Sequence, residues 1–307
     1  MEWIVARWVT FVATLLVTGA CAVALALVPR TAGTEDERRA IARDAARLGI
    51  GAVLALIPAS FLRLADQVMA LRSPGDPVLH GVDVLLTSTT WGTGFVWQCA
   101  SLLVAGIGCT LAWRAPRPTR WWLIASLGAL GLCATPALQG HAIGSEERTG
   151  LAVTADIAHV LGASVWLGAL GVIGWLGITL PNADGVVDPA HRALADARLR
   201  LLVPLVPPIA LPGAAMLIGS GVVATAMHLQ ELSDLWLTEW GRYVSAKTVL
   251  VSVIVALGAL NWRRLGPRLH EGTAVSSLRK SLVVELLVAL LVLMITAVLV
   301  VTPLPGE

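Results

Sequence analysis

Long apolar runs alternate with short polar segments along this chain of 307 residues. A helix that crosses the hydrocarbon core of a membrane needs about 20 mostly apolar residues. The pattern therefore predicts an all-α fold, a polytopic helical bundle of eight transmembrane helices that forms one integral membrane domain over residues 1–307. The predicted spans lie near 8–28, 45–64, 93–113, 121–141, 152–178, 201–225, 243–263 and 280–302.

The first run has a second interpretation as a cleaved signal peptide. Ala20-Cys21-Ala22 offers small residues of the type found at cleavage sites, and Arg7 provides a weak basic flank. The apolar stretch continues to Val28, however, and the arginine-rich segment follows it, so we expect a retained helix. The segment 35–47 is rich in both charge signs, and we expect a helix that lies on the membrane surface or extends the second span.

Composition narrows the class of protein further. The chain is 56% hydrophobic and 14% charged, whereas an ordinary soluble domain is about 45–50% apolar and about 25% charged. A soluble enzyme, a disordered chain and a nucleic-acid binder are therefore excluded, and the expected surroundings are a lipid bilayer. The four cysteines include no C-x-x-C pair, which excludes a disulfide scaffold and a zinc ribbon.

The basic residues are divided unevenly between the loops. The loops after the first, third, fifth and seventh spans hold sixteen Arg and Lys residues, and the opposite side holds four. Cytoplasmic loops of membrane proteins carry the excess of Lys and Arg. We therefore predict that both termini face away from the cytoplasm, which in a bacterial inner membrane is the periplasmic side.

Asp156 and His159 are the clearest candidates for chemistry inside a span. They are three residues apart, so they share one helix face, which continues to Ala163 and Trp166. Ionisable residues inside a membrane usually face a partner or a water-filled cavity. The pair has two interpretations that spacing alone leaves open, a metal site or a structural Asp–His hydrogen bond.

Further ligands could join this pair on the external side. His141 ends the fourth span, which must be an antiparallel neighbour of the fifth, and Met227 and His228 follow at the end of the sixth. Imidazole binds copper, zinc, nickel and iron alike, so the ligand types do not name the metal. His80, Asp83 and Glu231 are weaker candidates.

Two more charged residues fall inside predicted spans. We expect Lys247 to extend toward the interface or to pair with an acid, and Glu285 to contact Asn261 or Arg263. The segment from Gly241 to Lys247-Thr248 lacks the second glycine of a P-loop. Neither a nucleotide nor ATP-driven pumping is therefore expected.

Several motifs are spread along the chain: Gly140-His141-Ala142, Asp156-x-x-His159, Trp166-Leu167-Gly168-Ala169, and the segments 240–247, 258–265 and 278–285. Together they resemble the copper resistance protein D (CopD) family of bacterial inner-membrane proteins, and the similarity is strongest over 195–303, the sixth to eighth spans. The three upstream motifs resemble the family's Gly-His-Ala, Asp-x-x-His and Trp-x-Gly-Gly elements. Ala169 stands where the family has its second glycine, a departure that concerns helix packing rather than ligands.

The resemblance implies an eight-helix protein that handles copper ions at a periplasmic site, with a CopC-type copper donor as a separate chain. Our leading hypothesis is a copper permease rather than an enzyme, with copper captured by His141, His159 and Asp156. The alternatives are a membrane redox protein that holds haem, and a scaffold that delivers copper to a membrane oxidase. Haem would need two histidines at matching depth, whereas His141 and His159 are expected at different depths.

Overall fold

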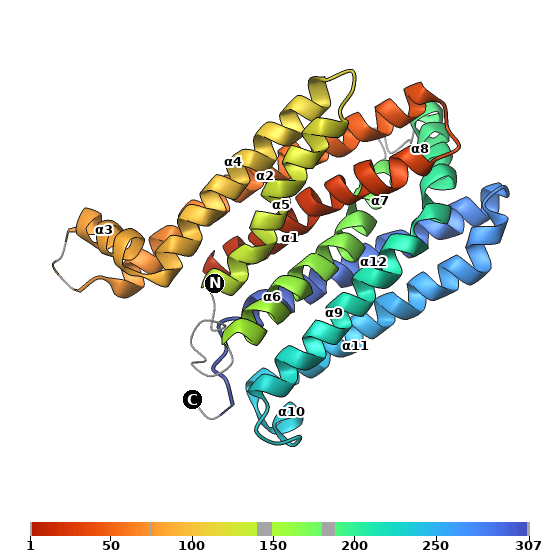
Figure 1. Cartoon of the computed structure of the whole chain (residues 1–307). Helices are drawn as coiled ribbons and strands as arrows, with labels where there is room; N and C mark the ends of the chain where they lie inside the picture. Colours follow the sequence, from red (N-terminus) through yellow and green to blue (C-terminus); the bar gives the residue numbers. More distant parts are fainter. Residues whose placement is uncertain (1, 74, 76, 140–148, 180–187, 306–307) are drawn as a thin grey trace.

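The computed structural model describes residues 2–73, 75, 77–139, 149–179 and 188–305, and within these ranges the chain is helical without strands. Figure 1 shows that the long helices lie side by side in one bundle. They are α1 (Glu2–Ala22), α2 (Glu35–Leu71), α3 (Val78–Ser88), α4 (Thr90–Arg114), α5 (Thr119–Gln139), α6 (Thr149–Ala163), α7 (Ala169–Gly177), α8 (Pro189–Leu202), α9 (Pro207–His228), α10 (Asp234–Leu237), α11 (Glu239–Leu260) and α12 (Gly272–Leu299).

The predicted number of spans is confirmed in the described part of the chain. Eight helical segments there are long and apolar enough to cross a membrane. Short π-helical turns extend or join some of these segments, and one of them, η4 (Ser164–Gly168), links α6 and α7 into a single span. The spans cover 4–30, 35–71, 90–114, 119–139, 150–177, 207–228, 239–268 and 272–299.

The charged segment 35–47 extends the second span instead of forming a separate surface helix. α2 runs for 37 residues, which is roughly 55 Å at about 1.5 Å per residue. A reciprocal cap starts it, because the Glu37 amide donates to the Thr34 hydroxyl and the Thr34 amide donates to the Glu37 carboxylate. The acidic side chains of the first turn lie at the N-terminus of α2, where the positive end of the helix dipole stabilises negative charge.

The sixth span begins later than its apolar run predicts. The run near 201–225 is interrupted after Leu202, where α8 ends and the short 3-10 turn Val203–Leu205 follows. Proline lacks the amide hydrogen that a continuing helix needs, and Pro204, Pro207 and Pro208 are closely spaced here. The spanning helix α9 therefore starts at Pro207.

The bundle has two apolar cores. The larger core joins α1, α2, α4, α5, α7, α8 and the start of α12, with Trp122 as its largest fully buried side chain. The smaller core joins the end of α6, η4, α9, α11 and α12 around Leu15 of α1. Within this second group α9 packs against α6 and η4, whereas α11 packs against α12.

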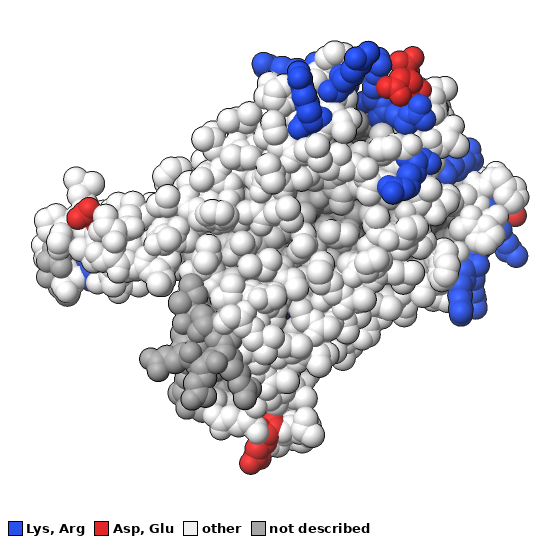
Figure 2. Space-filling view, viewed as in Figure 1, with Lys and Arg blue, Asp and Glu red and all other residues white. Residues whose placement is uncertain are grey.

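Basic side chains gather at one end of the bundle, as Figure 2 shows. They belong to the start of α2, the α4–α5 loop, α8 and the α11–α12 connection. We call this the Arg-rich end, and the other the Arg-poor end. The loops that the sequence assigns to one membrane face thus lie together in space.

Candidate functional site

A groove of about 1590 Å³ opens at the Arg-poor end of the bundle. It lies between α6 and α9 on one side and α11 and the end of α12 on the other, and α1, α2 and α5 complete its wall. We call it the His159 groove. Six residues that the sequence marks as candidates line it: Asp156, His159, Met227, His228, Glu231 and Lys247.

Ser220 of α9 determines which nitrogen of His159 carries the proton. The His159 Nδ1 atom lies 3.3 Å from the Ser220 Oγ atom. The single hydroxyl proton of Ser220 is already donated to the Met216 carbonyl at 2.6 Å. The hydroxyl oxygen must therefore accept, so we assign the hydrogen of neutral His159 to Nδ1, and Nε2 keeps its lone pair.

Lys247 of α11 occupies the space beside this lone pair. Its Nζ atom lies 3.3 Å from the His159 Nε2 atom, so the ammonium donates to the ring. No carboxylate in the described ranges lies within ion-pair distance of Lys247. The lysine thus reaches the imidazole, an arrangement that neither expectation for this residue included.

Asp156 lines the groove one turn before His159 on α6. No hydrogen bond joins its carboxylate to the His159 ring in the part of the chain that the structure describes. The structural Asp–His hydrogen bond that the spacing allowed is therefore not formed. The carboxylate remains available as a ligand or as a negative charge in the groove.

The other predicted residues take different positions. His228 donates from Nδ1 to the Ala224 carbonyl at 2.7 Å, and its ring centre lies 6.0 Å from that of Trp240. Trp166 belongs to the smaller apolar core and does not line the groove. His141 lies outside the described residues. Among the residues that are described, no three His, Cys, Asp or Glu side chains are grouped closely enough to hold a metal ion.

Ser220 is a site residue that the sequence interpretation missed. A Cβ atom on Gly221 would lie 3.2 Å from the His159 Cε1 atom, so a larger residue there would crowd the ring. The available signal was the isolated Gly219-Ser220-Gly221 segment within an apolar helix. Small residues at helix interfaces of membrane proteins allow close approach, and a serine among them can hydrogen-bond across the interface.

Glu285 lies away from the groove, toward the Arg-rich end of α12. It is 3% exposed, and its carboxylate accepts from the Asn261 amide, which also donates to the Ser281 hydroxyl at 2.9 Å. The expected contact between Glu285 and Asn261 is therefore present. This bridge connects α12 with the π-helical turn η6 (Asn261–Leu265), which continues α11 at the Arg-rich end.

Two family models match the chain. One, described as copper resistance protein D, matches residues 207–299, and the other, described as the copper resistance protein D-like N-terminal domain, matches residues 1–151. The chain belongs to the copper resistance protein D family. The first match covers α9, α11 and α12, so it includes Ser220, His228 and Lys247, whereas Asp156 and His159 lie between the two matched ranges.

A curated relative of this CopD-family chain is the copper transport protein CutJ of Bacillus subtilis strain 168. The two are 25% identical over 266 residues, which is 85% of this chain and 46% of CutJ. The chain thus spans less than half the length of that relative. No solved structure matches this chain.

Proposed function

We propose that this chain is a permease that moves copper ions across the bacterial inner membrane and captures them in the His159 groove. The observation that carries the proposal is the imidazole of His159, whose Nδ1 is held by Ser220 and whose Nε2 faces the groove. Family membership and the printed name of CutJ support copper as the transported ion. Imidazole nitrogen is a good copper ligand, so the chemistry of the groove agrees with this cargo.

In this mechanism copper binds His159 through Nε2. Lys247 must then move aside, because its ammonium lies 3.3 Å from that nitrogen and repels a second cation. Asp156 supplies negative charge, and the Met227 thioether and the His228 ring offer further ligands on the same groove. His141 is proposed to complete the capture site.

The proposed direction of access follows from the charge distribution. The Arg-rich end faces the cytoplasm by the positive-inside rule, so the groove opens to the periplasm. A periplasmic copper donor of the CopC type, acting as a separate chain, would deliver the ion there.

The test is copper flux into proteoliposomes that contain the purified full chain. Replacing the two histidines of the proposed capture site, His141→Ala with His159→Ala, should abolish copper uptake. The control is His191→Ala, because His191 is exposed on α8 near the Arg-rich end and should leave flux unchanged. Unchanged flux in the double variant would refute the site.

Two further measurements separate the competing functions. A delivery scaffold would bind copper with the same histidine dependence and transport none of it into sealed vesicles. A redox protein would show a Soret band after purification, and that band would disappear in a variant of its axial histidine. The permease predicts both copper binding and copper flux, without haem absorbance.

A further inference from the structure

A chain of hydrogen-bonded polar side chains crosses the first half of the bundle. Arg63 of α2 donates from Nη2 to the Gln139 side-chain oxygen at 2.8 Å. The Gln139 amide donates to Gln98 at 3.1 Å, and the Gln98 amide donates to the Ser60 hydroxyl at 2.8 Å. Gln98 is 2% exposed and Ser60 4% exposed. These neutral groups hold the guanidinium in place without cancelling its charge.

The charges around Arg63 do not balance. Arg7 of α1 lies 3.9 Å from Asp66, one turn beyond Arg63 on α2. Arg63 itself has no carboxylate within 4.0 Å among the residues whose positions are described. Within the described residues two arginines therefore share one aspartate, which leaves one positive charge there uncompensated. Such a charge inside a membrane protein is costly unless a counter-charge is present.

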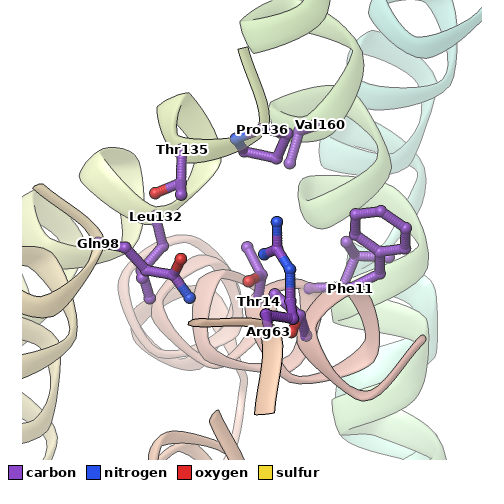
Figure 3. Close-up of a pocket in the computed structure, with 10 residues that line it drawn as sticks. Phe11, Thr14, Arg63, Gln98, Leu132, Thr135, Pro136 and Val160 are labelled. Carbon is purple, nitrogen blue, oxygen red and sulfur yellow. The ribbon is translucent and has the colours of Figure 1, made fainter. Parts of the chain in front are cut away.

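The guanidinium of Arg63 stands in a small cavity between five helices, as Figure 3 shows. The cavity has a volume of about 20 Å³. By this measure a single water molecule needs at least about 10–15 Å³, so one atom-sized guest fits and a tetrahedral oxyanion does not. Phe11, Arg63, Pro136 and Val160 line both this cavity and the His159 groove, so a small ion can reach it from the Arg-poor end.

The donors that face this cavity can be identified from the remaining hydrogen bonds. Thr10 and Thr135 donate their hydroxyl protons to carbonyl groups one turn earlier in their own helices. The Thr14 hydroxyl forms no side-chain hydrogen bond within the described ranges, and Arg63 uses one of its five N–H groups. Arg63 and Thr14 are therefore the groups free to donate to a guest.

We propose that the Arg63 cavity, defined by Thr14, Arg63, Gln98 and Thr135, binds a single monatomic anion of the halide class. Arg63 supplies the charge and the main hydrogen bonds, and Thr14 supplies a second donor. The anion balances the surplus positive charge and ties α1, α2, α4 and α5 together at the Arg-poor end. None of these four residues is a proposed copper ligand, although Arg63 also lines the His159 groove, and the proposal does not depend on the proposed transport activity.

The experiment measures thermal unfolding of the detergent-purified full chain at constant ionic strength while chloride replaces gluconate. We expect the unfolding midpoint to rise and then saturate with chloride and with bromide, because a ligand that binds only the native state stabilises it. Sulfate exceeds the cavity and can meet Arg63 only from the His159 groove, so it should not reproduce a rise in the midpoint that depends on Thr14. An equal response to all of these anions would overturn the proposal.

Variants assign the response to this cavity. Arg63→Gln should weaken apparent chloride affinity at least about tenfold, because hydrogen bonds to a charged group are among the stronger ones. Thr14→Val keeps the side-chain shape and should weaken the chloride affinity less than Arg63→Gln does. This variant serves as the test if Arg63→Gln does not fold. The control is Arg242→Gln, an exposed arginine near the Arg-poor end. If both variants kept the chloride response of the wild type, the site would be refuted. If Arg63→Gln did not fold, an unchanged response in Thr14→Val would refute it.

Discussion

At the scale of single residues, the properties of His159 depend on two neighbours from other helices. Ser220 accepts from Nδ1, and Lys247 donates to Nε2. In the proposed copper site the first contact would prepare the ring for metal binding, because the partner of one ring nitrogen sets the tautomer and the orientation of the other. The second contact places a tethered cation where a copper ion would bind.

Replacing Ser220 with alanine should weaken copper binding. Ser220→Ala removes the acceptor of the Nδ1 hydrogen, so the ring loses both its fixed orientation and its preferred tautomer. Loss of such a partner typically reduces metal affinity by about 10- to 100-fold. Competition with a chelator in detergent measures this affinity. Ser252→Ala is the control, because Ser252 is exposed on α11, and equal affinities in the two variants would contradict the assigned role.

Replacing Lys247 with leucine should tighten copper binding and slow transport. Lys247→Leu removes the ammonium that lies 3.3 Å from Nε2 and so removes its repulsion of the metal. We expect affinity to rise at least about tenfold, since unit charges at this range interact by several kcal/mol near a protein surface. The chelator competition and the flux assay together check this. Lys280→Leu, at an exposed lysine near the Arg-rich end, should change neither quantity.

At the scale of helices, α1 and the π-helical turn η4 meet in direct backbone contact. A Cβ atom on Gly168 would lie 2.1 Å from the Leu15 carbonyl oxygen, and one on Gly19 would lie 2.2 Å from the Gly168 carbonyl carbon. The two backbones therefore touch, which only glycine permits. Ala169 is buried without such a clash, which explains why the family's second glycine can be alanine here.

Gly168→Ala should lower the unfolding midpoint of the purified protein. The new methyl group must push α1 away from η4, and overpacking of this kind costs about 1–3 kcal/mol. Gly219→Ala is the matched control, because a Cβ atom there meets nothing within 4 Å and alanine favours a helix. If both variants unfolded at the wild-type temperature, the close contact would not contribute to stability.

At the scale of the whole molecule, the uneven distribution of basic side chains predicts the orientation of the bundle in the membrane. Basic side chains gather at the Arg-rich end, and the groove with its histidines opens at the other end. The groove lies between the α6–α9 pair and the α11–α12 pair. An inward path for copper would start on the face opposite the arginines.

Reporter fusions test this direction. A phosphatase that folds only in the periplasm should be active when fused after residue 307 and inactive when fused after Arg117, in the α4–α5 loop at the Arg-rich end. The positive-inside rule is the physical reason, since cytoplasmic loops retain Lys and Arg. Activity at Arg117 together with inactivity at the C-terminus would show the reverse orientation.

The sequence by itself determined the eight spans, the separation of charge and the family motifs. These follow from local properties, because the length of an apolar run and the spacing of arginines act through the nearby chain. The boundaries of α2 and α9 also had local causes, in the Thr34 cap and the proline cluster, although the apolar pattern alone did not place them.

Only the tertiary structure decided what surrounds His159 and Arg63. Ser220 and Lys247 are 61 and 88 residues away from His159 along the chain, and Gln139 is 76 residues away from Arg63. Contacts over such separations depend on how α6, α9 and α11, or α2 and α5, pack side by side. Periodicity along one helix gives the face on which a residue lies, but the partner of that face depends on helix packing.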